Sequence, residues 1–260
     1  MPILGIIASS MVGTPTSPVA GYKVWLDAAD TSTIALSGTA VTQWNDKSGS
    51  AYAFSQGTAG YRPVSGTTTQ NGKNVIVFDT DDTLLSTAAS SVWKFLNDGT
   101  TYTIFIATKE SATDAGRVWM STDGNTSANV GFRFRGNPTR LLEHAVLRGT
   151  GGSPSVNNIT ANNVVDTNFT YLTILGDPSN GTAANRSSIT VKQGSAIKNN
   201  TDSQSVSNTN PFETLRIGDI SAGGGVSIDG QLGEILIYES TLSGANILLN
   251  QQYLANKWGV

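Results

Sequence analysis

The side chains that most often carry out catalysis are scarce in this chain. It has no cysteine and a single histidine, His144. Thiol catalysis, disulfides and cysteine-based zinc or iron–sulfur sites are therefore excluded, and so is a metal site built from several histidines. A Ser–His–Asp arrangement would have to use His144 as its base. Because this residue lies in a segment, residues 141–149, that is predicted to be a strand, an ordinary strand histidine is the preferred interpretation and a catalytic base is the alternative.

Three aspartates, Asp79, Asp81 and Asp82, follow an apolar segment at residues 73–78. Carboxylates this close together, with neighbouring backbone carbonyls, are the oxygen ligands that calcium prefers. The same spacing suits a polar turn, in which aspartate side chains accept hydrogen bonds from nearby backbone amides. The turn is the preferred prediction, calcium is the alternative, and no other cofactor is expected.

The chain contains five tryptophans, whose rings could stack on sugars. Trp25, Trp44 and Trp258 belong to regular strand or helix patterns, so we expect them to pack in the core. Trp93 and Trp119 are the two for which sugar stacking stays open.

Arg133 and Arg135 alternate with Val130, Phe132 and Phe134 in the clearest period-2 stretch of the sequence. The two arginines could contact a carboxylate or a polyanion, but a face exposed to water is the preferred prediction. The net charge of −3 gives no overall attraction for nucleic acid or for an anionic membrane surface. Neither is expected as a partner.

Short strands must position these residues. Only 13% of the chain is charged and it has 28 glycines, a composition that suits many strands joined by tight turns. Segments 73–79, 101–109 and 168–176 are rich in β-branched and aromatic residues. There is no βαβ alternation and no repeated module. The sequence therefore predicts an all-β fold, a single antiparallel sandwich over residues 21–260.

One amphipathic helix is expected to close this domain. Ser243 is the predicted N-cap, because its hydroxyl can accept a hydrogen bond from an amide of the first turn, and Gly259 is the predicted end. At 100° per residue, one side of this helix carries a stripe of apolar residues that is predicted to be buried: Ile247, Leu248, Leu254, Ala255 and Trp258. Leu249 and Tyr253 are predicted to point away from this stripe.

Residues 1–20 are predicted to form an N-terminal arm. Its apolar run is far shorter than the roughly 20 residues that span a membrane, and it lacks the basic start of a signal peptide. Pro15 and Pro18 favour an extended path. An edge strand of the protein's own sheet is an equal alternative to docking on a neighbouring subunit. The side chains expected to dock are Ile3, Leu4, Ile6 and Ile7.

Four parts of the chain together resemble one family. They are WLDAAD at residues 25–30, QWNDKSG at 43–49, NGKNVIVFD at 71–79, and GEILIY with YLANKW at the end. Their order resembles that of laminin G-like domains of the concanavalin A-like lectin/glucanase superfamily, in the form found in bacterial and bacteriophage proteins. The resemblance covers residues 21–260 and implies a jelly roll of two curved antiparallel sheets with a C-terminal capping helix. Thr80, where glycine is expected, and the missing Glu-Arg pair near the helix start depart from the family pattern.

Glycoside hydrolases need two carboxylates. They lie about 5–5.5 Å apart in enzymes that retain the anomeric configuration and about 6.5–9.5 Å apart in enzymes that invert it. The resemblance implies that such a pair would lie on one strand, as Glu-x-Asp-x-x-Glu. Glu234 and Glu239 are five positions apart, an odd offset that places them on opposite faces of a strand. We therefore expect no enzymatic activity, and the resemblance implies that Glu234 is part of the family's structural motif. The glutamates without the required spacing are Glu110, Glu143, Glu213, Glu234 and Glu239.

The first ten residues, MPILGIIASS, are similar to the start of many tailed-phage structural proteins. Together with the family resemblance, they predict a non-enzymatic bacteriophage virion protein, either a capsid decoration protein or a tail appendage. Its arm would bind other virion proteins, and the protein would be a homo-oligomer. The alternative is a carbohydrate-binding module or a receptor-binding tail-fibre adhesin, with a host surface glycan as ligand. The sequence does not identify the residues of that glycan site.

Overall fold

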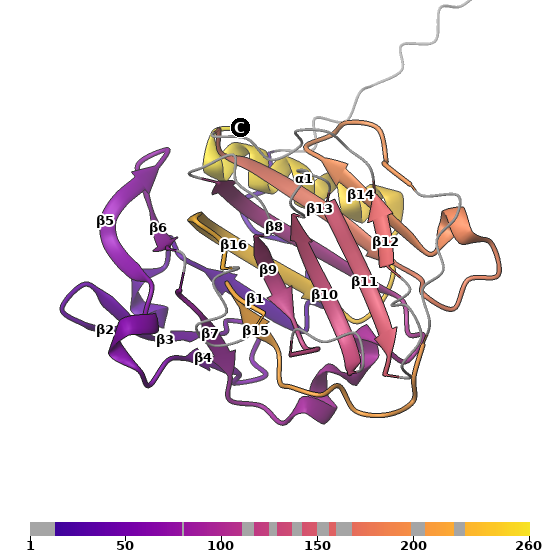
Figure 1. Cartoon of the computed structure of the whole chain (residues 1–260). Coiled ribbons are helices and arrows are strands. Elements are labelled where there is room, and N and C mark those ends of the chain that lie inside the picture. Colours follow the sequence, from indigo (N-terminus) through magenta and orange to yellow (C-terminus); the bar gives the residue numbers. More distant parts are fainter. Residues whose placement is uncertain are drawn as a thin grey trace, which may run out of the picture.

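The structure is a computed structural model that describes residues 14–79, 81–110, 117–124, 129–136, 142–149, 156–159, 168–198, 206–220 and 227–260. Ile3, Leu4, Ile6 and Ile7 lie outside these residues, so the docking role of the arm stays a prediction. The described residues form sixteen β-strands, one α-helix and short 3-10 helices (Figure 1). The 3-10 helices are η1 (Thr31–Thr33), η2 (Ala59–Tyr61), η3 (Ser90–Leu96) and η4 (Ala183–Asn185).

The strands form two layers. The two layers are connected, because each strand along the path is hydrogen-bonded to the next. The layers meet where β3 and β5 pair through Ala40 and Val64. One layer contains β2 (Ile34–Ser37), β3 (Ala40–Asn45), β4 (Ala53–Ser55), β7 (Leu84–Ser86), β15 (Arg216–Ile217), β9 (Val118–Ser121), β10 (Val130–Gly136), β11 (Leu142–Arg148) and β12 (Val156–Ile159). The other contains β5 (Val64–Gln70), β6 (Lys73–Phe78), β16 (Gly230–Tyr238), β1 (Val24–Asp27), β8 (Tyr102–Glu110), β13 (Thr170–Gly176) and β14 (Ser187–Val191).

Neighbouring strands pair in antiparallel fashion, as the sequence predicts. Figure 1 shows β9, β10, β11 and β12 in front of β8, β13 and β16, with the helix α1 (Gly244–Trp258) behind. The molecule therefore has three levels: one layer of strands, a second layer, and a helix on the outer face of the second.

The central strand β8 is buried on both faces because it lies between the two cores. Ile104 and Ile106 belong to the core between the layers, whereas Phe105 and Ala107 belong to a second core under α1. Leu254 of the helix packs in that second core. This double burial accounts for the continuous apolar run in the sequence of β8, since a strand with one wet face would alternate.

The closing helix begins and ends where the sequence predicts. The Ser243 hydroxyl accepts a hydrogen bond from the backbone N–H of Asn246 at 3.3 Å. Gly259 adopts a left-handed conformation, with φ of 70°, and its N–H donates to the carbonyl of Ala255. Both termini of α1 are thus capped by the expected residues.

The predicted buried stripe of α1 is wrong at two positions. Leu248 is 44% exposed, whereas Tyr253, predicted to point away from the domain, is buried. The middle of the buried face is occupied by Asn250 and Gln251. Their amide groups donate to the hydroxyl of Tyr238 at 3.1 Å and to a threonine hydroxyl of β13 at 3.0 Å. A pattern of hydrophobic residues misses this face because its centre is polar and hydrogen-bonded.

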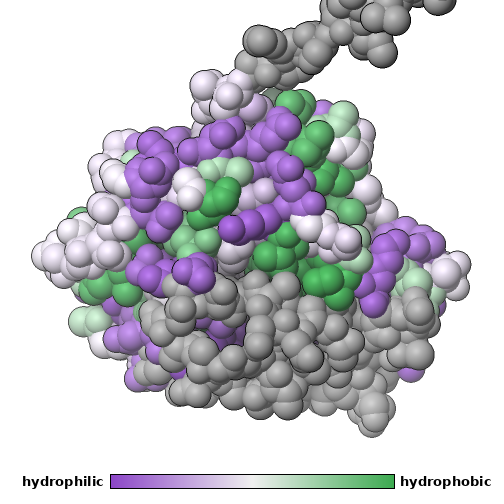
Figure 2. Space-filling view, turned by 90° about the horizontal axis from the view of Figure 1, so that it is seen from above, coloured by the Kyte–Doolittle hydropathy of each residue, from purple (hydrophilic) through white to green (hydrophobic). Residues whose placement is uncertain are grey.

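The surface offers many hydrogen-bonding groups. On the face seen in Figure 2, hydrophobic residues form separate small groups between hydrophilic ones. Among the described residues, the large hydrophobic side chains that are exposed are Leu36, Val206, Phe212 and Leu248. No helix in the described part of the chain is long and apolar enough to cross a membrane.

Candidate functional site

A fully buried carboxylate, that of Glu234 in β16, organises the outer face of the second layer. It accepts hydrogen bonds from the indole N–H of Trp25 at 2.7 Å, the indole N–H of Trp258 at 3.1 Å and the hydroxyl of Tyr253 at 2.7 Å. The ammonium of Lys257 lies 2.8 Å from it. Burial raises the pKa of Glu234, and the charge of Lys257 lowers it. Glu234 thus ties β1 and α1 to β16, which agrees with its interpretation as a structural residue.

Asp27 extends this network towards the surface. Its carboxylate lies 2.6 Å from the ammonium of Lys257 and 3.0 Å from that of Lys47. Lys47 also lies 2.8 Å from Asp30 and lowers the pKa of that carboxyl by hydrogen bonding. These ion pairs connect β1, the turn at residue 47 and the last turn of α1.

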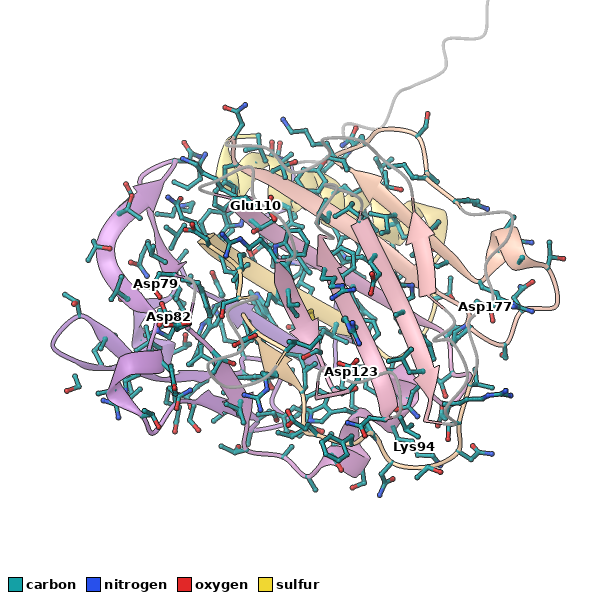
Figure 3. All side chains as sticks on the ribbon, viewed as in Figure 1. Asp79, Asp82, Lys94, Glu110, Asp123 and Asp177 are labelled. Atoms are coloured by element: carbon teal, nitrogen blue, oxygen red, sulfur yellow. The ribbon has the colours of Figure 1, made fainter. Side chains whose placement is uncertain are left out.

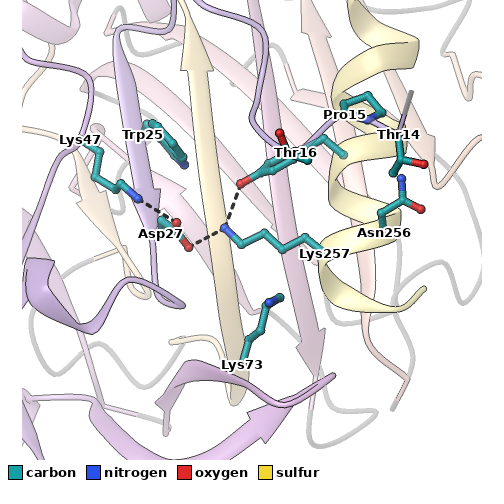
Figure 4. Close-up of a pocket in the computed structure, with 10 residues that line it drawn as sticks. Thr14, Pro15, Thr16, Trp25, Asp27, Lys47, Lys73, Asn256 and Lys257 are labelled. Atoms are coloured by element: carbon teal, nitrogen blue, oxygen red, sulfur yellow. Dashed lines mark hydrogen bonds and ion pairs between the residues drawn. The ribbon is translucent and has the colours of Figure 1, made fainter. Parts of the chain in front are cut away.

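A pocket of about 470 Å³ opens beside these ion pairs (Figure 4). One wall is the segment that precedes the domain, which is held in place at Val19. The N–H of Val19 donates to Asn250 at 2.8 Å, and its carbonyl accepts from Tyr238 at 2.6 Å. Residues 14–20 form no strand. The pocket is lined by Thr14, Pro15, Thr16, Trp25, Asp27, Lys47, Lys73, Tyr253, Asn256 and Lys257.

Trp25 is the partly exposed aromatic side chain of this pocket. Its indole N–H is held by Glu234, and the ammonium of Lys47 lies 4.2 Å from the centre of its ring. The side chains of Asn256 and Thr16 are exposed at the rim. A fixed aromatic ring with amide, hydroxyl and ammonium groups around it can bind a ligand that has both apolar faces and many hydroxyls.

The prediction that Trp25 packs in the core is therefore incomplete, because its ring also lines the pocket. The alternative prediction that Trp93 and Trp119 stack on sugars is wrong. Both of those side chains are fully buried. The alternation of β1 contains the signal for Trp25, because Val24 and Leu26 on either side of it are buried. A residue between two inward-pointing neighbours must point outward.

The prediction that Arg133 and Arg135 face water is also wrong. Arg133 is only 7% exposed, and Arg135 is partly buried. Arg133 binds the carboxylate of Asp123, and Arg135 lies 2.9 Å from that of Glu143. Glu143 is on the neighbouring strand β11, where it is paired with Arg135. Period 2 correctly separates the two faces of β10, but it does not show that the polar face is covered.

His144 is fully buried in the core between the layers. Its ring nitrogens lie 2.6 Å from the hydroxyl of Tyr102 and 2.6 Å from that of Ser187. Burial lowers its pKa to about 3. These contacts support the interpretation of His144 as a structural residue.

Of the aspartates expected to form a turn or a calcium site, Asp79 and Asp82 lie close together, on the side of the molecule that carries β5 and β6 (Figure 3). The backbone N–H of Asp79 donates to Asp82 at 2.8 Å, and that of Asp81 lies 3.4 Å from Asp79. Burial raises the pKa of Asp82 to about 6. Among the described residues, no three acidic or histidine side chains are grouped so that they could hold a metal ion. The contacts are those of the predicted polar turn.

The remaining glutamates lie in separate places. Glu213 is in an ion pair with Arg216 at 2.7 Å. Glu239 is exposed and binds Lys23, while Glu110 ends β8 and is buried. None of these three lines the pocket.

No protein-family model matches this chain, and no curated protein matches it. Solved structures do. One is Trypanosoma rangeli sialidase in complex with sialic acid, at 12% identity and a TM-score of 0.57, covering 92% of this chain and 34% of that one. Another is domain 4 of AbnA, a GH43 extracellular arabinanase from Geobacillus stearothermophilus, in complex with arabinotriose. It has 10% identity, a TM-score of 0.57, and coverage of 90% and 98%.

A third match is the binding domain of botulinum neurotoxin DC in complex with SialylT, at 11% identity and a TM-score of 0.53. It covers 89% of this chain and 52% of that one. The chain therefore spans about a third of the sialidase chain, half of the toxin chain and nearly all of the arabinanase domain. At this identity the likeness shows the fold, which is the predicted concanavalin A-like jelly roll with a C-terminal helix.

Proposed function

We propose that this chain is a non-catalytic carbohydrate-binding domain whose sugar site is the pocket beside Trp25. The observation that carries the proposal is the partly exposed indole of Trp25, fixed by Glu234, with exposed polar side chains at the rim of the same pocket. Sugar rings have apolar C–H faces edged by hydroxyls. Such a ligand matches a rigid aromatic surface surrounded by hydrogen-bonding groups.

The similar structures support this function because they include separate domains solved with bound ligands. The arabinanase domain matches over nearly its whole length and contains arabinotriose. The toxin structure is a binding domain in complex with SialylT. The likeness supports this class of ligand; the particular sugar must come from the pocket itself.

The absence of catalysis is part of the proposal, and the carboxylates at the pocket support it. Glu234 has no exposed surface and is bound by three hydrogen-bond donors and Lys257. Asp27 is 7% exposed at its side chain and is paired with Lys47 and Lys257. A glycosidase needs one carboxyl as acid and a second as nucleophile or base at the scissile bond. Both candidates here are occupied by structural contacts.

Replacing Trp25 with alanine should lower the affinity of the full chain for its glycan about tenfold or more, since truncated aromatic anchors dominate binding free energies. The measurement is a glycan array, followed by calorimetric titration with each glycan that binds. Trp25→Phe, which keeps an aromatic ring, should retain part of the affinity. Saturable binding that is unchanged in both folded variants would place the site elsewhere.

Two asparagine variants of α1 provide a second test with a smaller expected effect, one inside the pocket and one outside it as the control. Asn256→Ala removes an exposed rim amide and should weaken binding about two- to tenfold, the value of one ordinary hydrogen bond. Asn246→Ala changes the same residue type near the start of α1, outside the pocket, and should leave affinity unchanged. Equal effects of the two substitutions would contradict the assignment of the pocket.

A second candidate function is a bacteriophage virion protein, of which the glycan-binding domain would be the outward part. It is supported by the laminin G-like sequence segments and by the apolar run Ile3, Leu4, Ile6 and Ile7. That run precedes a segment tied to the domain at Val19. In a virion, copies of the protein would be held by their arms to capsid or tail subunits.

Deleting residues 1–13 should abolish association with virions while leaving the domain folded, because the contacts of Val19 remain. Burying the four apolar side chains would contribute roughly 1.5–3 kcal/mol each before ordering costs. The measurement is the copy number of the truncated protein in purified particles. A copy number of the truncated protein equal to that of the wild type would contradict the docking role of the arm. It would not affect the proposal of glycan binding.

A further inference from the structure

Lys73 is brought to the pocket by a tight hairpin. Asn71 and Gly72 have φ angles of 49° and 70°, and they connect β5 to β6 between the paired residues Gln70 and Lys73. An Asn-Gly pair with two positive φ angles forms the two-residue turn that best matches strand twist. Lys73 is therefore the first residue of β6, at a position fixed by the turn.

The tip of the same hairpin is fastened to the end of α1. The side-chain amide of Gln70 donates to the carbonyl of Trp258 at 2.7 Å, and that of Asn71 donates to the carbonyl of Lys257 at 3.1 Å. The last carbonyls of a helix have no partner within the helix, so these bonds satisfy them. They also hold Lys73 beside the C-terminal half of α1, which forms another wall of the pocket (Figure 4).

The three lysines of the pocket differ in their partners. Lys47 contacts Asp27 and Asp30, and Lys257 contacts Asp27 and Glu234. Lys73 is partly exposed and forms no ion pair or side-chain hydrogen bond within the described part of the chain. Lys47 and Lys257 are thus each shared between two of these three carboxylates, and the third ammonium, that of Lys73, is available to a ligand.

We propose that the pocket binds an acidic glycan, whose carboxylate contacts the ammonium of Lys73 while a sugar ring packs against Trp25. This inference rests on the proposed function and names the class of its ligand. An ammonium and a carboxylate form a charge-assisted hydrogen bond, which is stronger than a bond between neutral groups. Because Lys257 and Lys47 are already paired, Lys73 discriminates acidic sugars from neutral ones.

The test uses the full chain and two matched pairs of ligands. One pair is an oligogalacturonide and its carboxyl-reduced form, and the other is 3′-sialyllactose and lactose. The acidic member of at least one pair should bind about tenfold more tightly, equivalent to about 1.4 kcal/mol. Its advantage should decrease as salt is raised, since the contact is partly exposed.

Lys73→Gln should reduce the affinity for the acidic member to that for its neutral partner, and it should leave the neutral affinity unchanged. The control is Lys94→Gln. Lys94 is in η3, is partly exposed, does not line the pocket, and lies at the end of the molecule away from α1 (Figure 3). This control should keep the full preference for the acidic ligand.

The outcomes separate the inference from the function on which it rests. Equal binding of acidic and neutral partners, or an acidic preference that survives Lys73→Gln, overturns the role of Lys73 while glycan binding stands. A lack of binding to every glycan, in both these pairs and the array, overturns the proposed function itself. Tighter acidic binding that Lys73→Gln abolishes and Lys94→Gln preserves supports both.

Discussion

Replacing Glu234 with leucine is expected to lower the free energy of unfolding by about 3–5 kcal/mol, the cost of breaking a buried ion pair by removing one partner. The change leaves Lys257 without the more deeply buried of its two carboxylate partners. It also leaves the indole N–H groups of Trp25 and Trp258 and the hydroxyl of Tyr253 without their acceptor. Buried donors without acceptors are costly, whereas replacing every member of the cluster at once would be less so.

Urea unfolding of the variant and the wild type measures this difference, with Glu239→Gln as the control. Glu239 is exposed and its ion pair with Lys23 lies at the surface, so its loss should cost about 0–1 kcal/mol. Glu234→Gln keeps the shape and one acceptor and should fall between the two. A Glu234→Leu variant as stable as the wild type would show that the carboxylate does not hold β1 and α1 together.

The second large effect is expected when the pH is lowered, because the free energy of unfolding depends on the protonation of His144. Its pKa is about 3 in the folded protein, against 6.5 for the ordinary imidazole. Between these values the unfolded chain binds a proton that the folded chain does not bind, so the stability contributed by neutral His144 is complete above pH 6.5 and is lost as pH falls. At pH 5 the loss is about 2 kcal/mol relative to pH 7.5.

Asp82 changes the stability with pH in the direction opposite to His144. A variant that lacks only the histidine is therefore needed to separate the two effects. Its pKa is raised to about 6 from 3.8, so the folded state takes up the proton first and gains stability as pH falls through 6. His144→Gln removes the histidine and keeps Asp82. The variant should be less stable than the wild type at pH 7.5, and urea unfolding should show this gap narrowing by about 2 kcal/mol at pH 5. A gap that is independent of pH would contradict the buried neutral histidine.

The fold could be predicted from local patterns because most elements carry them within a few residues. Strand β8 is rich in β-branched and aromatic residues, and α1 has both of its capping residues, Ser243 and Gly259. The family resemblance joined these elements into one architecture. The same resemblance identified Glu234 as structural, although its hydrogen-bond donors come from β1 and α1, more than 200 and about 20 residues away.

The site could be predicted only in part because its properties arise from packing between distant segments. Trp25 points outward by simple alternation, but only the position of α1 shows that it faces a pocket. Arg133 has the alternation of a solvated residue and is nonetheless buried against Asp123. The polar face of α1 at Asn250 and Gln251 is buried through hydrogen bonds that hydropathy does not represent.

The central claim is that a glycan binds against Trp25, and the indole N–H signals of the tryptophans test it most directly. Trp93 donates its indole N–H to Thr214 and Trp119 donates to Thr108, both in the core, while the partly exposed ring of Trp25 lines the pocket. Titrating the isotope-labelled chain with an array-positive glycan should shift the Trp25 signal in a saturable way and leave those of Trp93 and Trp119 in place. Saturable binding that leaves the Trp25 signal unmoved would contradict the account.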